Sequence, residues 1–355
     1  MSENMNRREF LPLAGVGAIM APTIITGCSS KTLSASDPIS IPGTIAFERN
    51  TGLDRHVYIA NWNAETRINL TADIPGKHGR PCWSPDGSAL YFDSEVDGKS
   101  SIKRINDIAD PVGSLETIVD DEGHQIHPQV HPDGDLLVYT QMTTLSIISN
   151  GCLVAYDMSS SQEISRTGNC ITKAGDDSQS VDRAFVPGER NMIVTGVPGE
   201  GLYDPDTGVV EPYEFILNSD DISMNTVAFS SDGTFCYGLG MTNLGVDEFG
   251  IDFGDYDVLV RWEFQGERKV VILDENSQVD VKSRKMGELI ELPEQLVMLC
   301  SCRVGLVDSE DLWRIGYCNL GDPGNIKPKK ISIAAFDNMF GDNSWPRYTT
   351  VEHIL

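Results

Sequence analysis

The sequence predicts an all-β fold, a single β-propeller of six four-stranded blades whose ring is closed by the C-terminal strand. Three observations support this prediction. A strand–turn–strand unit recurs about every 45 residues, short alternating strands fill the intervals between its copies, and no long helical periodicity appears. Four short strands in a period of this length are typical of a propeller blade.

The strand–turn–strand unit is clearest in residues 81–92, which read PCWSPDGSALYF. Residues 128–139 (PQVHPDGDLLVY) and 226–237 (TVAFSSDGTFCY) repeat it, and residues 183–194 and 289–299 are weaker copies. In the clear copies a short strand enters a turn that contains Asp-Gly, and a second strand leaves it. Glycine accepts the positive φ that closes such a turn, and proline presets φ at its entry. Each copy therefore predicts the first two strands of a blade.

Two further strands are expected after each unit. In the first complete blade they are residues 101–105 and 115–119, where apolar and polar side chains alternate. Residues 151–157 and 163–167 have the same pattern and predict an antiparallel pair that turns between Ser159 and Ser161.

The ends of the repeat array predict how the ring closes. Residues 43–49 read as the second strand of a blade with no first strand before it, and two more strands follow by residue 71. The missing first strand matches residues 345–350, and pairing of this segment with residues 43–49 leaves no open sheet edge. Five copies and this split blade give six blades. Counts of five and seven stay open, because residues 141–180 and 240–290 are irregular.

The Trp-Ser-Pro-Asp-Gly repeat in residues 81–92 resembles that of TolB-like β-propellers, a periplasmic family. The resemblance covers residues 43–355 and implies the fold far more than an activity, since propellers support binding, assembly and catalysis alike.

The N-terminus resembles a twin-arginine lipoprotein signal. Arg7 and Arg8 precede an apolar run that ends at Ile25, and the run is followed by Thr-Gly and Cys28. The run is shorter than the roughly 20 residues that a membrane-spanning helix needs. By resemblance, the paired arginines address the chain to the twin-arginine export route, and Cys28 is the lipid-accepting cysteine of a lipobox.

The resemblance implies three regions: a signal peptide (1–27), a flexible tether of small residues (28–42) and the propeller domain (43–355). Acylation of Cys28, as in palmitate-bearing lipoproteins, would anchor the chain to a membrane. Ser29 stands where an aspartate is associated with inner-membrane retention. An outer-membrane, periplasm-facing position is therefore expected if the cell is Gram-negative.

The net charge of the chain limits the classes of molecule that it is expected to bind. The chain has 53 acidic and 27 basic side chains, a net charge of −26, and the acids are spread along its length. Such a field disfavours binding to nucleic acid. The expected partners are the membrane, through the lipid anchor, and a protein or polysaccharide.

Seven cysteines besides Cys28 follow the signal. The hairpin at residues 151–167 brings Cys152 near Cys170, and a second turn places Cys300 or Cys302 opposite Cys318. An exported chain can form these disulfides, but buried free cysteines also act as small apolar side chains.

His124, His127 and His131 lie in one short segment. Imidazoles bind transition metals, and oligogalacturonate lyases, which resemble TolB-like propellers, bind a metal through histidines. A divalent metal and a metal-dependent, polysaccharide-active enzyme are therefore the alternative interpretation. Two facts weigh against it: all three histidines share one segment, and His-Pro-Asp-Gly is a variant of the repeat's own turn. No other cofactor is predicted.

An acidic loop is the second candidate site. Its carboxylates are able to bind a hard cation through oxygen ligands, but their spacing does not match an EF-hand. A solvated acidic loop or a contact with a partner is the simpler interpretation. The residues are Asp247, Glu248, Asp252, Asp255 and Asp257.

No catalytic residue is predicted, because the chain has no Gly-x-Ser-x-Gly elbow and no glycine-rich phosphate loop. The sequence thus favours a membrane-anchored binding scaffold over an enzyme.

Overall fold

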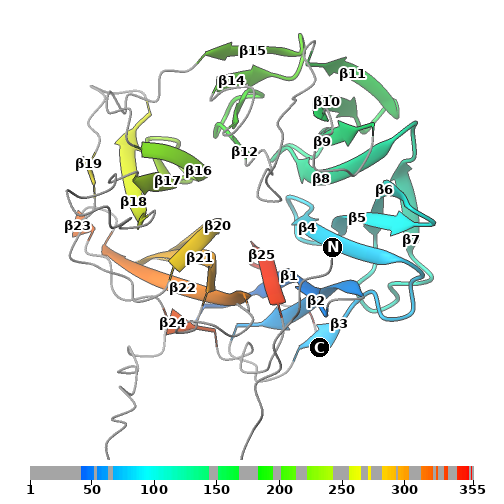
Figure 1. Ribbon diagram of the computed structural model, residues 1–355, viewed down its shortest axis with the longest axis horizontal. Helices are drawn as coiled ribbons and strands as arrows, with labels where there is room; N and C mark the ends of the chain where they lie inside the picture. The colour runs from blue at the N-terminus through cyan, green and yellow to red at the C-terminus, as the bar shows by residue number, and fades with distance from the viewer. Residues whose placement is uncertain are drawn as a thin grey trace, which may run out of the picture. The chain divides into compact units, whose positions relative to one another are not determined.

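Each copy of the repeat folds into two antiparallel strands joined by a tight turn. In the computed structural model, these pairs and the strands that follow them form the blades of a β-propeller (Figure 1). The described residues are 41–51, 54–62, 67–143, 151–167, 183–194, 201–212, 222–242, 256–264, 271–272, 282–292, 295–303, 313–322, 325–326, 332–334, 342–351 and 353. All of them belong to the larger of two compact units, Ser36–Leu355. Within these residues, no helix has the length and apolar character that a membrane crossing requires.

The strands of the described residues form five four-stranded sheets and one five-stranded sheet, numbered 1 to 6 here in chain order. Sheet 1 contains β25 (Asp342–Thr349), β1 (Thr44–Asn50), β2 (Arg55–Asn61) and β3 (Ile68–Asn69), in that order. Sheet 2 contains β4 (Lys77–Trp83), β5 (Leu90–Val96), β6 (Lys99–Ile105) and β7 (Leu115–Val119). Sheet 3 contains β8 (His124–Val130), β9 (Leu136–Met142), β10 (Gly151–Asp157) and β11 (Gln162–Arg166).

The second half of the chain continues the pattern. Sheet 4 contains β12 (Arg183–Phe185), β13 (Met192–Val194), β14 (Gly201–Asp204) and β15 (Val209–Pro212). Sheet 5 contains β16 (Ile222–Phe229), β17 (Phe235–Thr242), β18 (Tyr256–Glu263) and β19 (Val271–Ile272). Sheet 6 contains β20 (Lys282–Leu292), β21 (Gln295–Arg303), β22 (Trp313–Asp322) and β23 (Asn325–Ile326), and β24 (Ser332–Ile333) also pairs with β22.

The predicted strand pairs are confirmed as β4–β5, β8–β9, β12–β13, β16–β17 and β20–β21. The predicted pairing of the two chain ends is also confirmed. β25 pairs antiparallel with β1, and Thr349 lies opposite Thr44. Ile41, which the sequence assigns to the tether, is 1% exposed and belongs to the core. The core therefore begins two residues before the predicted boundary at residue 43.

Hydrophobic clusters join neighbouring sheets. The cluster that contains Phe47 and Val297 joins sheets 1 and 6, and the one that contains Phe92 and Val57 joins sheets 1 and 2. Three further clusters join sheet 2 to sheet 3, sheet 3 to sheet 4 and sheet 4 to sheet 5. Each sheet is thus buried on its neighbours rather than on a separate layer.

The turns between the first and second strands of successive sheets touch one another. We call them the turn belt: residues 84–89, 131–135, 186–191 and 230–234, with Thr349 of β25. A Cβ atom built on Gly87 would lie 2.1 Å from Thr349 Oγ1, and one on Gly134 would lie 3.9 Å from Pro85 Cγ. His131 Nε2 hydrogen-bonds to the Glu189 carbonyl oxygen at 2.9 Å.

The same contacts continue into sheets 5 and 6. A Cβ atom on Gly233 would lie 3.3 Å from Pro187 Cβ, and the Ser231 N–H donates to Glu291 Oε1 at 2.9 Å. The turn belt therefore links sheets 1 to 6 in order along one face.

The residues after β25 form a second set of contacts between sheets 1 and 2. The His353 ring stacks on Trp83 of β4, with ring centroids 5.1 Å apart and an interplanar angle of 9°. His353 Nε2 lies 3.1 Å from the Gly87 carbonyl oxygen. Its backbone N–H donates to Thr44 Oγ1, and its carbonyl accepts from Asn61 Nδ2, both at 3.1 Å.

Replacement of His353 by alanine tests how much these contacts stabilise the fold. Loss of the ring stack and the side-chain hydrogen bond is expected to lower the free energy of unfolding by about 1–2 kcal/mol. Urea denaturation followed by tryptophan fluorescence measures the change. Val112→Ala, at a 54% exposed position, is the control and should have almost no effect. Equal stability of the two variants would show that the stack contributes nothing.

Candidate functional site: a buried carboxylate–arginine network

The first strands of sheets 2 and 3 are bulged at equivalent positions of the repeat. The β4–β5 register shifts between Gly79 and Cys82, and the β8–β9 register shifts between Ile126 and Gln129. Arg80 and His127, 47 residues apart and each followed by proline, lie within these bulges. Their φ angles are 51° and 57°. Left-handed backbone costs a residue with a side chain roughly 1–3 kcal/mol, so the surrounding contacts must hold it in place.

Those contacts come from the second strand of the preceding sheet. The Arg80 N–H donates to Glu48 Oε2 at 3.1 Å, and the His127 N–H donates to Asp93 Oδ2 at 3.3 Å. Glu48 of β1, Asp93 of β5 and Thr140 of β9 occupy equivalent places in their sheets, as the strand registers show. All three are buried, with exposed fractions of 7%, 0% and 6%.

Sheet 4 uses a different donor at this place. Arg183 of β12, 6% exposed, donates from Nη1 to Thr140 Oγ1 at 3.1 Å. Its Nη2 donates to the carbonyl oxygens of His127 and Val138. The strained peptide of His127 is therefore held at its N–H by Asp93 and at its carbonyl by Arg183.

Asp93 is the centre of the network. Its carboxylate accepts from Arg55 Nη2 at 2.9 Å and from Arg80 Nη1 at 3.1 Å. Arg55 reaches it from sheet 1. Burial opposes the charge of Arg55, but the carboxylates of Asp93, Glu48 and Glu95 outweigh it and raise the pKa of the guanidinium.

Gly79 makes room for this arrangement. A Cβ atom at this position would lie 2.1 Å from Glu48 Oε2 and 3.1 Å from Arg55 Nε. The carboxylate of Glu48 and the guanidinium of Arg55 thus pass through space that any side chain at residue 79 would occupy.

The network can present cationic donors while keeping the backbone rigid. The side chains of Arg55 and Arg80 are 16% and 24% exposed. A guanidinium has five N–H groups, and among the described contacts each of these two donates a single hydrogen bond, to Asp93. Preorganised arginines suit carboxylate, phosphate and carbonyl groups of a ligand.

The three predicted histidines lie along one strand and are not brought together. His124, at the start of β8, accepts the Ser100 N–H at Nδ1 over 3.3 Å. His131 lies beyond the other end of β8, 4% exposed. Seven residues of strand span roughly 20 Å, whereas ligands of one zinc ion each lie about 2 Å from it.

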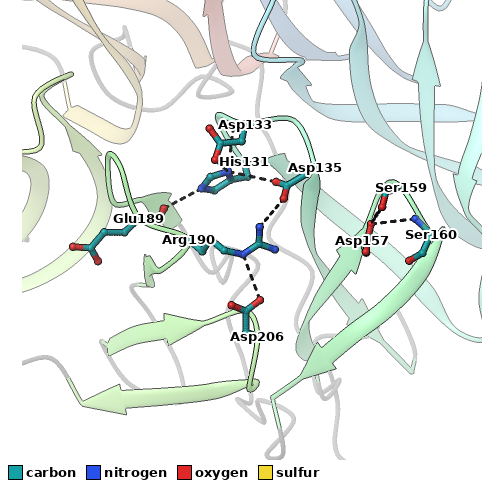
Figure 2. Close-up of polar contacts among 9 residues, drawn as sticks. All are labelled: His131, Asp133, Asp135, Asp157, Ser159, Ser160, Glu189, Arg190 and Asp206. Carbon is teal, nitrogen blue, oxygen red and sulfur yellow. Dashed lines mark hydrogen bonds and ion pairs between the residues drawn. The ribbon is translucent and has the colours of Figure 1, made fainter.

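His131 is a turn residue (Figure 2). Its Nδ1 accepts the Asp133 N–H at 3.1 Å, and its Nε2 bonds to the Glu189 carbonyl. Both ring nitrogens are thus used within the turn belt. Among the residues the structure describes, no group of three or more His, Cys, Asp or Glu side chains is arranged to hold a metal ion.

Figure 2 also shows the ion pairs beside His131. Arg190 bonds to Asp135 at 2.6 Å and to Asp206 at 3.3 Å, all three side chains being 37% exposed or more. In the next hairpin of sheet 3, hydrogen bonds from the Ser159 hydroxyl and from the N–H groups of Ser160 and Ser159 lower the pKa of Asp157 to about 2. Exposed pairs of this kind contribute little stability, so they shape the turns rather than form a reactive centre.

Several other predicted residues fall outside the description. Arg7, Arg8, Cys28, Cys170, Asp247, Glu248, Asp252 and Asp255 are among the residues that the structure does not describe. Asp257 lies in β18, opposite Met241. The acidic-loop site therefore stays a prediction.

The structure gives positions for several of the cysteines but does not establish the predicted disulfide pairs. Cys152 is buried in β10 and disulfide-bonded; its pairing with Cys170 stays a prediction. Cys318 lies opposite Met298 and Cys300 opposite Gly316, so the two cysteines are diagonal neighbours in the β21–β22 register, and their disulfide also stays a prediction. Cys82 and Cys236 are buried, and burial raises the pKa of the Cys236 thiol.

Sequence reasoning did not single out the network. Its signal is present in the repeat, since Arg80-Pro81 and His127-Pro128 hold the same position 47 residues apart. No sequence motif identifies the acceptors Glu48 and Asp93, because the hydrogen bonds that they accept come from a neighbouring sheet.

Asp93→Asn tests the network. The substitution removes the buried charge that two partly exposed arginines share, and it is expected to lower the free energy of unfolding by about 3–5 kcal/mol. Chemical denaturation measures this loss. The control is Asp120→Asn, which breaks the exposed Lys99–Asp120 pair and should cost less than about 1 kcal/mol. Similar losses in both variants would contradict the central role of Asp93.

His78 predicts a pH dependence. This residue of β4 is fully buried, and its Nε2 bonds to the Ile74 carbonyl at 2.9 Å. Burial lowers its pKa to about 4. Because the unfolded chain binds a proton near pH 6.5 and the folded chain does not, this group's contribution to stability is present above pH 6.5 and falls as the pH drops toward 4.

The expected loss between pH 7 and pH 5 is about 2 kcal/mol from this group alone. His78→Gln should remove it, and glutamine is the residue that sheet 3 carries at the equivalent position, Gln125. Denaturation curves of both proteins at the two pH values give the difference. The same pH slope in both proteins would refute the assignment to His78.

No protein-family model and no curated protein sequence matches the chain. Solved structures do resemble it. TolB from Acinetobacter baumannii superimposes with a TM-score of 0.56 at 16% identity, over 88% of this chain and 67% of that one. A putative TolB from Agrobacterium tumefaciens gives 0.45 at 16% identity, over 88% of this chain and all of that one. At these identities the likeness shows the fold, and the chain folds as an all-β propeller similar to that of TolB.

Proposed function

We propose that this chain is a lipid-anchored, periplasm-facing propeller that works as a binding scaffold. In this proposal the twin-arginine signal exports the chain, Cys28 is acylated, and the six sheets form a closed ring that binds a protein or a polymeric ligand. The outer membrane is the expected location in a Gram-negative cell.

The observation that carries the proposal is the short distance along the chain between Cys28 and the propeller. Ile41 is already buried in the core, and the Tyr348 hydroxyl donates to the Pro42 carbonyl at 2.5 Å. Thirteen peptide units separate Cys28 from Ile41, and fully extended they reach about 45 Å. An anchor at Cys28 would thus hold the propeller close to a membrane surface.

Closure of the ring is supported by two contacts. β25 pairs with β1 within sheet 1, and the Phe47–Val297 cluster packs sheet 1 against sheet 6. A closed ring leaves the sheet edges at the joint paired, which suits a stable platform for binding.

The binding role is supported by the exposed parts of Arg55 and Arg80. Their guanidinium groups are fixed by Asp93 and keep donors free of it. They are therefore the residues on which we expect ligand contacts to depend. The alternative, a metal-dependent polysaccharide enzyme, is favoured by no observation among the described residues, because His124 and His131 lie at opposite ends of β8.

Substitution of Cys28 tests the anchor. Cys28→Ser is expected to move the protein from the membrane fraction to the soluble fraction and to remove the mass of the acyl chains. Fractionation followed by intact-mass measurement checks both. Ser30→Ala, two residues away, should leave the protein in the membrane. A Cys28→Ser protein that stays membrane-bound would show that the anchor lies elsewhere.

Affinity capture from native membranes tests the binding role. Arg80→Gln is expected to recover at least about tenfold less partner than the natural protein, since one lost charge-assisted contact is worth about 1.5–3 kcal/mol. Arg104→Gln is the matched control, because Arg104 is similarly exposed at 26% and pairs with Glu116 in the same sheet. A thermal melt shows that both variants are folded. Equal recovery by both variants would exclude Arg80 from the binding site.

A further inference from the structure

Sheets 2 and 3 lie side by side in the propeller (Figure 1), and buried side-chain oxygens lie at the interface between them. Gln125 of β8 lies opposite Gln141 of β9, and Tyr139 is on the same side of β9 as Gln141. This side packs on sheet 2, since Tyr139 shares a hydrophobic cluster with Tyr91 of β5. Gln125 and Tyr139 are 0% exposed. Within the described part of the chain, the Oε1 atoms of both glutamines and the Tyr139 hydroxyl have no hydrogen-bond partner.

Sheet 2 contributes a fourth oxygen, the hydroxyl of Ser100 in β6. Ser100 is on the same side of its strand as Ile102, which belongs to the same hydrophobic cluster as Tyr139. The Ser100 N–H donates to His124 Nδ1 at 3.3 Å, so Ser100 lies beside the start of β8. Ser100 is 1% exposed, and its hydroxyl has no partner among the described residues. We call the side-chain oxygens of Ser100, Gln125, Tyr139 and Gln141 the oxygen cluster.

The chain that enters β8 orients the two glutamine amides. Gln125 Nε2 donates to the carbonyl oxygens of Asp121 at 3.3 Å and Glu122 at 3.1 Å. Gln141 Nε2 donates to the same Glu122 carbonyl at 2.7 Å. Because a carbonyl oxygen can only accept a hydrogen bond, the amide nitrogens face these carbonyls and the two Oε1 atoms point away from them. Two amides that share one carbonyl oxygen lie side by side.

The repeat shows that packing does not require these oxygens. Tyr139 and Gln141 follow Phe92 and Ser94 of sheet 2 by 47 residues and occupy the equivalent places of β9. Phe92 is 0% exposed, so a ring without a hydroxyl fills the place of Tyr139 in the preceding sheet. The hydroxyl of Tyr139 and the longer amide of Gln141 are features of sheet 3.

Negative charge lies next to the oxygen cluster. The carboxylates of Asp121 and Glu122 are exposed, and neither has an ion pair among the described contacts. Burial, and after it the Asp121 carboxylate, raises the pKa of the Tyr139 hydroxyl, which stays protonated at neutral pH. A chain with a net charge of −26 attracts cations. Two cations of the neighbourhood are already paired with other carboxylates: Lys99 with Asp120 and Arg166 with Glu163.

An oxygen-ligated cation fits this set of atoms. Buried polar atoms normally have partners, so four without one at a single interface indicate a bound group. Ca²⁺ takes about six to eight oxygen ligands at roughly 2.3–2.6 Å, including side-chain and backbone carbonyls and water. Transition metals prefer nitrogen and sulfur ligands, whereas the cluster consists of oxygens.

We propose that the oxygen cluster binds a hard cation, of which calcium is the expected one, at the interface between sheets 2 and 3. The cation connects Ser100 of β6 to Gln125 of β8 and Gln141 of β9, and the carboxylates of Asp121 and Glu122 attract it electrostatically. The site differs from the histidine segment considered above, because its ligands are amide and hydroxyl oxygens. Calcium bound there stabilises the contact between two neighbouring blades.

Calcium titration of the full-length protein tests the site. The protein is depleted of metal with EGTA, dialysed free of the chelator and titrated with calcium chloride in a calorimeter. We expect one calcium ion per chain and a melting temperature that rises with calcium concentration, because the ion binds only the folded chain. Magnesium chloride should raise the melting temperature much less, since Mg²⁺ demands near-ideal octahedral geometry.

Two substitutions locate the ion. Ser100→Ala and Tyr139→Phe should each weaken calcium binding at least about tenfold, because even the loss of a group behind a metal ligand typically has that effect. Without calcium, neither variant should melt below the natural protein, since the hydroxyl that is removed makes no described hydrogen bond. Ser94→Ala is the matched control: Ser94 is 0% exposed and lies on the side of β5 that faces sheet 1, with Phe92. It should bind calcium like the natural protein.

Three results would overturn the inference. A natural protein that binds no calcium would show that water satisfies the cluster. Equal calcium affinity in Ser100→Ala, Tyr139→Phe and the natural protein would place the ion elsewhere, for example in the acidic loop that contains Asp252. Variants that melt lower than the natural protein in EGTA would show that the two hydroxyls already have partners within the protein.

Discussion

The carboxylate of Asp93 is the contact on which the inner part of sheets 1, 2 and 3 depends. It is fully buried and lies between the guanidinium groups of Arg55 and Arg80. A buried charge is costly unless its partners are well placed, and here the partners come from two sheets while a third supplies the His127 N–H. One ionised group therefore fixes the relative positions of strands that are far apart in the sequence. It also stabilises backbone that would otherwise be strained.

The repeat explains how such a contact recurs. A single blade cannot bury its own faces, so each sheet relies on the next one for its core. The same dependence is seen in the polar groups: Glu48, Asp93 and Thr140 each accept a hydrogen bond from the following sheet. At the other end of the strands, the turn belt supplies the contacts between neighbouring sheets. Two sets of contacts between blades, one polar and buried and one at the turns, thus hold the sheets in register.

The two sets of contacts differ in chemistry. The turn belt carries exposed carboxylates such as Asp133 and close contacts between successive turns. The inner network carries arginines whose donors are only partly used in the described contacts and whose guanidinium groups are held by Asp93. Preorganised donors of this kind gain affinity because little ordering cost remains at binding.

The sequence by itself determined the strands, the turns and the pairing of the chain ends, because these depend on local chemistry. Asp-Gly turns and alternating side chains specify a hairpin wherever they occur, and the unpaired strands at both ends of the array indicated their own partners. Only the tertiary structure decided the sites. His124 and His131 are seven residues apart in the sequence, and an extended strand separates them by roughly 20 Å. Asp93 and Arg55 are unremarkable in the sequence, and they meet because adjacent sheets pack face to face across a bulge that Gly79 leaves open. Strand formation is a local property of the chain, whereas the meeting of charged side chains depends on how separate sheets pack.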